Sequence, residues 1–327
     1  MEPAILKVRD LTVDFRGTGK ILDRVSFDLD RGQTIGIVGE SGCGKSMMAL
    51  SIMRLMPSLA LRITGGRVEL DGEDLLEASD QRMREVRGSK AAMIFQDPMT
   101  SLNPLYTIGD QIAESIRKNG QVDRREAMAK TVGMLKAVGI PDPARHLGEY
   151  PHQLSGGKRQ RVMIAMALAG NPDVLIADEP TTALDVTVQA QIFEQLRAMQ
   201  EKSGTSIILI THDMGAVAEM ADRVVVMYAG RIVEEGSVED ILDTPRHPYT
   251  RGLIACIPHL SDEPFDAWPL LPVIPGAVPG LAERQAGCTF APRCPLADRH
   301  CRENVPPLVE SAGRRIACWH GDGDSAR

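Results

Sequence analysis

One stretch near the N-terminus constrains this chain more than any other. Residues 39–46 read GESGCGKS, which fits the pattern G-x-x-x-x-G-K-[ST]. The apolar, partly β-branched run at 34–38 predicts a buried strand before it, and residues 47–56 predict a helix that stops at Pro57. A strand, a glycine turn and a helix N-terminus direct several backbone N–H groups at one point, which favours the binding of phosphates.

The residue types in this loop indicate separate roles around a bound nucleotide. Lys45 can reach the β- and γ-phosphates, and the Ser46 hydroxyl can ligate Mg²⁺. The other loop residues that we expect to contact the nucleotide are Gly39, Ser41, Gly42, Cys43 and Gly44. The alternative is a chance glycine turn, and the strand and helix on either side argue against it.

Composition narrows the class of protein. A chain of 327 residues with 43% hydrophobic residues predicts two domains and a sizeable core. The formal net charge of −7 argues against a general nucleic-acid binder, although it leaves room for a local basic patch. No apolar run approaches the roughly 18–20 residues that span a bilayer, and the N-terminus has no signal-peptide pattern. We therefore expect a cytoplasmic protein, for which a membrane role needs a partner subunit.

A second apolar run ends in two acidic residues. Residues 174–179 predict a buried strand that finishes with Asp178 and Glu179. Ligands of such folds bind at the carboxyl edge of the parallel strands, where both carboxylates would lie. We expect Asp178 to hold Mg²⁺, directly or through water, and Glu179 to act as the general base that orients the attacking water. The alternative is an acid pair in solvent.

Two further polar residues follow predicted strands. Gln96 comes after the short apolar run 91–95 and could reach a metal or a water, although a loop cap explains it equally well. His212 comes after the buried run 206–210 and could bond a γ-phosphate, although a structural histidine is the commoner case.

Residues 154–161 predict a second anion site. Ser155 is a good N-cap for the helix that follows, and Gly156 and Gly157 let a phosphate approach the backbone closely. One compact domain has no obvious need for two such sites, which hints at a nucleotide shared between two chains. The alternative is an ordinary helix N-terminus.

The remaining pattern surrounds these motifs with strands and helices. Residues 4–30 alternate apolar and polar and predict antiparallel strands joined by the turn 16–19, and residues 223–234 predict a hairpin. Phe15, just before the first turn, could stack on an adenine ring, but the pattern alone favours a core aromatic. Residues 108–139 are spaced as helices.

Taken together and in this order, the motifs resemble those of the ATPase subunit of ABC transporters, over about residues 5–235. This resemblance makes Phe15 the adenine-stacking residue, Gln96 the Q-loop, residues 154–160 the LSGGQ-type signature, Glu179 the Walker B base, Asp185 the D-loop and His212 the switch. It implies an α/β fold: a P-loop core with a mixed sheet, an antiparallel β subdomain and a helical subdomain at about 97–165.

The resemblance also implies how ATP is used. Each ATP would lie between the Walker A loop of one subunit and the signature of the other, in a head-to-tail dimer. Glu179, His212 and Gln96 become catalytic residues, and Gln96 joins Ser46 and Asp178 around Mg²⁺. The signature departs from the usual form at Lys158, where glutamine is common, but it keeps the serine and both glycines.

A narrower resemblance points to a subfamily. Residues 96–104 and 246–250 are similar to those of dipeptide and oligopeptide (and nickel) importers, whose ATPases often come as two different subunits, D-type and F-type. The C-terminal segment contains four clustered cysteines, between residues 288 and 318, and this cluster indicates the D-type. The implied partners are two integral membrane permease subunits, a second ATPase subunit of F-type and an extracytoplasmic substrate-binding protein, at the cytoplasmic face of the inner membrane, with no nucleic acid.

Two alternatives stay open at this stage. One is an importer ATPase for nickel or another small solute. The other is a soluble ABC-type ATPase that acts on nucleic acid or the ribosome; such proteins usually have two cassettes in one chain or long coiled-coil insertions, and neither is visible.

The chain changes character after residue 235, and we expect a nucleotide-binding domain at 1–235 and a C-terminal domain at 236–327. Short helices are expected at 238–242 and 249–255 of this proline-dense tail. Its four clustered thiols are Cys288, Cys294, Cys301 and Cys318. They could enclose Zn²⁺ or a [4Fe–4S] cluster.

The cysteine spacing favours iron over zinc. Zinc sites usually pair their ligands as Cys-x₂-Cys, which is absent here, and the proline-rich loops with a distant fourth cysteine lean towards iron–sulfur. D-type ATPases have a similar tail, with which a [4Fe–4S] centre is associated. Unligated thiols in a small core are the alternative, and a reducing cytosol argues against disulfides.

Overall fold

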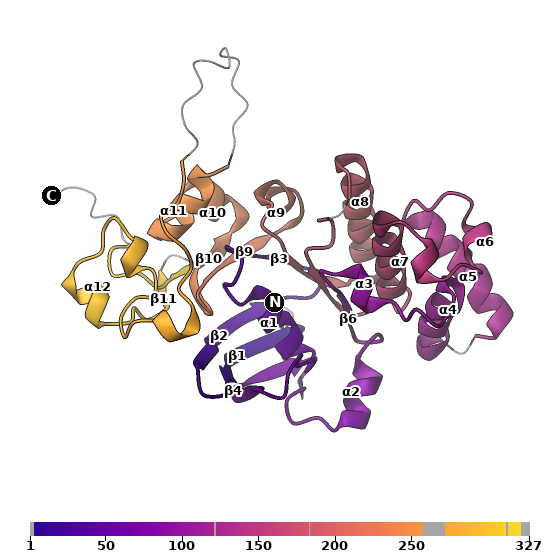
Figure 1. Cartoon of the computed structure of the whole chain (residues 1–327), viewed down its shortest axis with the longest axis horizontal. Helices are drawn as coiled ribbons and strands as arrows, with labels where there is room; N and C mark the ends of the chain where they lie inside the picture. The colour runs from indigo at the N-terminus through magenta and orange to yellow at the C-terminus, as the bar shows by residue number, and fades with distance from the viewer. Residues whose placement is uncertain (1–2, 121, 183, 258–271, 312, 322–327) are drawn as a thin grey trace, which may run out of the picture.

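A computed structural model of the protein describes residues 3–120, 122–182, 184–257, 272–311 and 313–321 (Figure 1). Two sheets form its framework. The smaller is antiparallel, in the order β2-β1-β4-β5, and the larger has the order β11-β12-β10-β9-β3-β8-β7-β6. This confirms the expected α/β class with an antiparallel β subdomain.

The antiparallel sheet comes from the first part of the chain. Its strands are β1 (Leu6–Phe15), β2 (Gly19–Leu29), β4 (Leu61–Leu70) and β5 (Glu73–Asp74). The first two form the predicted hairpin, with Phe15 opposite Gly19 across the turn.

The main sheet is mixed. Its strands are β3 (Thr34–Val38), β6 (Ala91–Ile94), β7 (Val174–Asp178), β8 (Ser206–Ile210), β9 (Arg223–Tyr228), β10 (Arg231–Ser237), β11 (Val309–Ser311) and β12 (Arg314–Ile316). From β9 through β3, β8 and β7 to β6 the neighbours are parallel, so their carboxyl ends meet at one edge. The predicted hairpin of β9 and β10 extends this sheet with an antiparallel pair.

Helices surround the main sheet (Figure 1). They are α1 (Lys45–Ile52), α2 (Asp80–Val86), α3 (Pro98–Ser101), α4 (Ile108–Asn119), α5 (Arg124–Ala137), α6 (Pro143–His146), α7 (Gly156–Leu168), α8 (Val186–Ser203), α9 (Met214–Met220), α10 (Val238–Asp243), α11 (Pro248–Ala255) and α12 (Arg299–Glu303). Short 3-10 turns lie at Pro151–Gln153, Leu281–Glu283 and Ala291–Arg293. Helices α4 to α7 gather at one end of the molecule (Figure 1).

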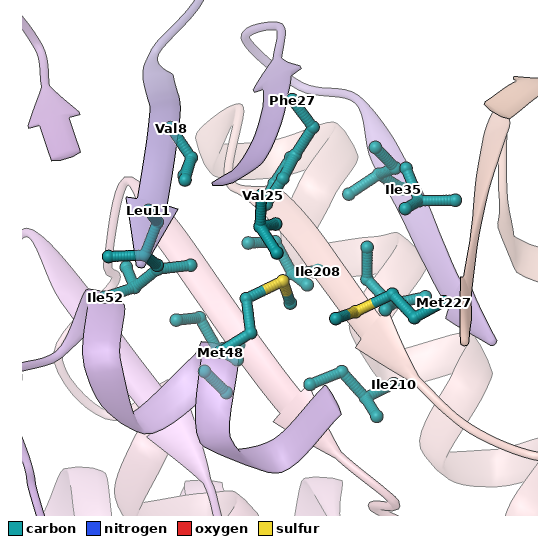
Figure 2. Close-up of a cluster of buried hydrophobic side chains, with 14 of the residues drawn as sticks. Val8, Leu11, Val25, Phe27, Ile35, Met48, Ile52, Ile208, Ile210 and Met227 are labelled. Carbon is teal, nitrogen blue, oxygen red and sulfur yellow. The ribbon is translucent and has the colours of Figure 1, made fainter. Parts of the chain in front are cut away.

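The central strands are buried on both faces, which explains their continuous apolar sequences. Ile208 and Ile210 of β8 join a hydrophobic cluster with the antiparallel sheet and α1, whereas Leu209 between them joins a second cluster with the helical end. Figure 2 shows the first cluster, where Met48 and Ile52 of α1 lie among side chains from both sheets.

The helix after the P-loop ends earlier than the sequence suggests. It stops at Ile52 rather than at Pro57, because Arg54 adopts a left-handed backbone conformation with φ 51°. The Arg87 guanidinium then donates to the carbonyl oxygens of Met53 and Arg54, at 3.0 and 2.9 Å. A distant side chain thus supplies the hydrogen bonds that these carbonyl groups would have accepted from backbone N–H groups if the helix had continued.

The tail is less irregular than its composition suggests. The expected short helices are present as α10 and α11. Beyond them, β12 pairs with β10 and β11 with β12, so the tail extends the edge of the main sheet. Residues 258–271, part of the proline-dense segment, lie outside the described residues. No described helix is long and apolar enough to cross a membrane.

Candidate nucleotide-binding site

The P-loop joins the carboxyl end of β3 to the N-terminus of α1, as the motif predicts. Gly39 has φ +149°, and a Cβ there would lie 2.3 Å from the carbonyl oxygen of Met227. Gly44, with φ +97°, would bring a Cβ to 2.9 Å from a Leu22 methyl group. Glycine is required at both positions because the loop passes against β9 and β2 and takes a backbone conformation that other residues rarely adopt.

Lys45 is the buried cation of this loop. Its Nζ donates to the carbonyl oxygens of Gly39 at 2.6 Å and Glu40 at 3.1 Å. Burial lowers the pKa of Lys45, and the nearby carboxylates of Glu179 and Asp178 oppose this by favouring the charged form. The ammonium group therefore lies against the backbone of the loop.

Asp178, at the end of β7, has the features of a cation ligand. Its side chain is buried, and its Oδ1 has no hydrogen-bond partner among the described residues. Burial raises the pKa of this carboxyl group, while a hydrogen bond from Ser46 lowers it. An unsatisfied buried carboxylate oxygen beside a hydroxyl group fits Mg²⁺, which prefers oxygen ligands.

Glu179 gathers three polar groups. Its Oε2 accepts from Gln96 Nε2 at 3.0 Å and from the Thr182 hydroxyl at 3.2 Å, and His212 Nδ1 lies 3.4 Å from its Oε1. The glutamate backbone is left-handed, with φ 49°, which is uncommon outside glycine and frequent at functional sites. The structure thus brings together Glu179, Gln96 and His212, and adds Thr182, which the sequence pattern did not indicate.

The signature residues lie elsewhere. Ser155 and Gly156 are exposed at the N-terminus of α7, and the Ser155 side chain makes no capping hydrogen bond. Within the described ranges, no hydrogen bond or ion pair joins residues 155–157 to the P-loop. The first N–H groups of α7 therefore face solvent and are suited to an anion from outside the subunit.

Two other predicted residues have visible local roles. Asp185 caps α8, because its Oδ1 accepts from the backbone N–H of Val188 at 3.0 Å. Phe15 is 36% exposed at the end of β1 and lines a hollow of about 410 Å³ with neighbours that include Arg16 and Lys20. A partly exposed ring beside a hollow suits stacking better than the core position that the pattern favoured.

The tail reaches the P-loop through residues that were not predicted as site residues. Tyr249 of α11 accepts a hydrogen bond from the backbone N–H of Glu40 at 2.7 Å, and Arg293 pairs with the Glu40 carboxylate. In the sequence, residues 246–250 stand out only as a subfamily mark, and no pattern distinguishes Arg293 or Glu40. Cys43 lies in the same place, buried, with its sulfur 3.9 Å from the Tyr249 hydroxyl.

The four tail cysteines are free thiols that influence one another. Burial raises the pKa of Cys318 to about 11, and charge on Cys294, Cys288 and Cys301 adds to the rise. The backbone N–H of Cys288 also donates to the carbonyl oxygen of Cys301 at 2.8 Å. The thiols therefore share one neighbourhood, as expected.

A tighter group lies beside them. The ligand atoms of Asp298, Cys301 and His320 lie within 4.8 Å of one another. The four cysteine sulfurs do not form so compact a group in the part of the chain that the structure describes. Four thiolates around one zinc ion would lie about 3.8 Å apart, given Zn–S bonds of about 2.3 Å.

Comparison with known proteins agrees with this geometry. Residues 22–182 match the family described as "ABC transporter", and residues 233–301 match the "Oligopeptide/dipeptide transporter, C-terminal region". The fold and the ATP site therefore define an ABC-type ATPase. The chain belongs to the ATP-binding subunits of the peptide ABC transporter family.

Two relatives illustrate the likeness. A probable peptide ABC transporter ATP-binding protein of Sinorhizobium fredii is 52% identical over 97% of this chain and 95% of its own. The dipeptide transport ATP-binding protein DppD of Bacillus subtilis is 48% identical over 97% and 95%. These matches confirm the resemblance inferred from the motifs.

Solved structures support the same fold. A dimeric ATP-binding cassette in a post-hydrolysis state, bound to ADP and Pi, matches with a TM-score of 0.65 and 28% identity, over 71% of this chain and 98% of that one. The protein cbiO1 of Clostridium perfringens, part of an ABC transporter complex, matches with a TM-score of 0.61 and 28% identity, over 74% and 92%.

Proposed function

We propose that this chain is the ATP-hydrolysing subunit of an importer of di- or oligopeptides. It works with two permease subunits, an extracytoplasmic binding protein and a second ATPase subunit, at the cytoplasmic face of the membrane. The observation that carries the proposal is the combination of the P-loop and the strand-end carboxylates of Asp178 and Glu179 with a tail of the oligopeptide/dipeptide transporter type, at residues 233–301. A relative named for dipeptide transport, 48% identical along nearly the whole length, supports it.

The geometry supports a division of labour at the ATP site. Lys45 and the P-loop N–H groups bind the β- and γ-phosphates. Ser46 and the unsatisfied oxygen of Asp178, with Gln96 nearby, would hold Mg²⁺, which neutralises phosphate charge when bound. Glu179 orients the attacking water and accepts its proton, and the hydrogen bonds to its carboxylate fix its position.

The second half of the site comes from another subunit. Because Ser155 and Gly156 are exposed and make no contact with the P-loop of their own subunit, α7 is suited to bind the γ-phosphate of an ATP held by a partner. Closure of two cassettes around ATP would move the permeases, and hydrolysis would release them. The likeness to a dimeric cassette supports this arrangement.

We also propose that the tail holds a [4Fe–4S] cluster on Cys288, Cys294, Cys301 and Cys318. The four thiols lie close enough for the charge of three of them to raise the pKa of Cys318, yet less compactly than a single zinc ion requires. A cluster suits this wider spacing because each thiolate binds a different iron. Its contribution would be to hold a loop-rich segment together.

Metal analysis of anaerobically purified protein tests the cluster. We expect about four irons per polypeptide with a broad absorption band near ~400 nm. Cys301→Ser should lose the iron, whereas Cys256→Ser, outside the ligand set, should keep it. One zinc per polypeptide, or iron content unchanged by Cys301→Ser, would refute the cluster as proposed.

Transport measurements test the function itself. The protein is co-expressed with its permeases and second ATPase, reconstituted in vesicles and supplied with the binding protein and a labelled dipeptide. We expect ATP-dependent uptake that Lys45→Ala abolishes along with ATP binding. Uptake of nickel instead of peptide would favour the metal importer, and failure to co-purify with any integral membrane protein would refute the transport role.

A further inference from the structure

Glu40, the second residue of the P-loop motif, is held from three directions. Its backbone N–H donates to the Tyr249 hydroxyl at 2.7 Å, and its carbonyl oxygen accepts from Lys45 at 3.1 Å. Its carboxylate receives two parallel hydrogen bonds from Arg293, at 2.7 and 2.9 Å. Two of these three partners belong to the tail, so the tail determines the position of a residue inside the phosphate-binding loop.

Arg293 is built into the tail rather than lying on its surface. Its side chain is 4% exposed and also donates to the carbonyl oxygens of Pro275 at 2.7 Å and Ile274 at 3.2 Å. A further contact, at 3.3 Å, joins it to the Tyr228 hydroxyl at the end of β9. A guanidinium group with this many partners is pre-organised, so little side-chain entropy is lost when it binds the carboxylate.

Aromatic rings fix the same junction. Tyr228 of β9 and Tyr249 of α11 meet edge to face, with ring centroids 4.6 Å apart. Phe290 of the tail contacts both rings, at 5.2 and 5.3 Å. Because Phe290 is three residues before Arg293, this packing places the short turn that carries the arginine against the P-loop.

The charge of Glu40 makes this contact more than structural. A carboxylate in the P-loop would repel the triphosphate that the loop binds, and the repulsion acts over several ångströms in a partly buried site. Arg293 pairs with that carboxylate through two parallel hydrogen bonds and so lessens the repulsion.

We propose that Arg293 is a positioning residue for ATP binding: it neutralises Glu40 and holds the P-loop in its phosphate-binding form. This inference rests on the proposed role of the P-loop in ATP binding. Because coupling between two sites is reciprocal, ATP in the P-loop also stabilises the contact with the tail.

The two members of the ion pair should then behave differently on mutation. Arg293→Gln leaves a carboxylate without its partner beside the phosphates and should weaken ATP binding by about 5- to 50-fold. Glu40→Gln removes a negative charge beside the phosphates and leaves the positive charge of Arg293 there, so it should tighten ATP binding, by about twofold or more. If the ion pair only stabilised the fold, Arg293→Gln and Glu40→Gln would weaken ATP binding equally.

Titration of the full-length protein with a fluorescent ATP analogue measures this, together with KM and kcat in the assembled transporter. For Arg293→Gln we expect KM for ATP to rise in parallel with the loss of ATP affinity, while kcat changes less. The double variant Glu40→Gln/Arg293→Gln should recover most of the lost affinity. As a control, Arg299→Gln removes another tail arginine from an exposed ion pair with Glu303 and should change neither quantity.

Specific results would overturn the inference. Unchanged affinity in Arg293→Gln, or a double variant as weak as the single one, would contradict it. If Arg293→Gln does not fold, Arg293→Lys keeps the charge but not the two parallel bonds and should bind ATP with intermediate affinity; wild-type affinity there would contradict the positioning role. If Lys45→Ala still binds ATP, the proposed ATP site itself fails, whatever Arg293 does.

Discussion

At the scale of single residues, the catalytic role proposed for Glu179 depends on its neighbours. Its two carboxylate oxygens are divided between Gln96 and Thr182 on one side and His212 on the other. All three partners are polar side chains, and none is a lysine or an arginine. In the proposed mechanism the same groups would move onto water and phosphate once ATP binds.

Glu179→Gln should therefore separate binding from hydrolysis. The amide keeps the shape and can still accept one hydrogen bond, but it cannot take a proton from water. We expect ATP affinity to be retained and turnover in the assembled transporter to fall by about 10²–10⁴. Steady-state phosphate release measures turnover, and Glu201→Gln, an exposed glutamate of α8, is the control. A near-normal rate in Glu179→Gln would remove it as the base.

At the scale of elements, the P-loop depends on close contact with β9. Gly39→Ala would place a methyl group 2.3 Å from the Met227 carbonyl oxygen, and the loop backbone would have to move by about an ångström. We expect unfolding free energy to fall by about 1–3 kcal/mol and ATP binding to weaken as the loop leaves its position. Denaturant titration and nucleotide titration measure the two effects.

Gly32→Ala is the matched control for this steric argument. Gly32 is also left-handed, with φ +65°, but nothing lies within 4 Å of a Cβ there. The unfolding free energy of Gly32→Ala should fall only by the cost of a left-handed alanine, about 1 kcal/mol, and its ATP affinity should be unchanged. Equal losses in both variants would contradict the proposed steric contact with β9.

The start of α11 should make the protein sensitive to acid. His247 caps this helix by accepting the Tyr249 backbone N–H on Nδ1, at 3.0 Å, while the backbone N–H of His247 donates to the Glu234 carboxylate. Burial lowers the pKa of His247 from 6.5 to about 3, and the charge of Arg251 contributes to the lowering. The neutral ring is therefore the form that the fold holds.

The sign of the pH effect follows from this shift. Because the unfolded protein takes up a proton on His247 near pH 6.5 and the folded protein stays neutral there, stability is complete above that pH and falls as the pH drops towards 3. At pH 5 the loss is about 2 kcal/mol. His247→Asn offers its Oδ1 as the capping acceptor in place of Nδ1 and removes the titration, so the unfolding free energy of the variant should change less between pH 7 and pH 5. Identical changes in urea titrations of both proteins would contradict this.

The elements that sequence predicted best are those whose pattern is local. Strands such as β8 are buried on both faces and therefore read as apolar runs, and the P-loop motif fixed its own strand and helix. The predicted end of α1 was wrong because a distant arginine, Arg87, decides it. Strands β11 and β12 have three residues each, too few to show a period.

The site residues also divide into those that a local sequence pattern indicates and those that depend on distant parts of the chain. Asp178 and Glu179 were predicted because they end a buried strand, where the fold places ligands. The pair of Glu40 and Arg293 could not be predicted, since 253 positions separate the two residues and neither stands out in its own segment. Thr182 was missed because a threonine after an acidic strand end carries no distinctive signal.

At the scale of the whole molecule, the residues proposed for the two halves of an ATP site lie apart in the protein. In the proposed function, the P-loop with Asp178 and Glu179 forms one half, and the exposed N-terminus of α7 (Figure 1) forms the other. The residues of α7 lie at the helical end of the molecule, so they are suited to serve an ATP bound by the partner subunit. The proposed dimer therefore predicts that ATP binding depends on the P-loop half, whereas turnover needs both halves.

Ser155→Arg tests this division. The bulky cation would block the approach of a partner's phosphate to α7 but would leave the P-loop of the same subunit unchanged. We expect ATP affinity of the full-length protein to stay within about twofold of the wild type, while turnover at the partner's site falls by about 10²-fold, as for the loss of a main stabilising donor.

Single-turnover assays with Glu179→Gln in the same subunit isolate the partner's site. Ser203→Arg, an exposed serine at the end of α8, is the matched control. Loss of ATP affinity in Ser155→Arg itself would instead place the signature at the nucleotide of its own subunit, which a head-to-tail dimer does not allow.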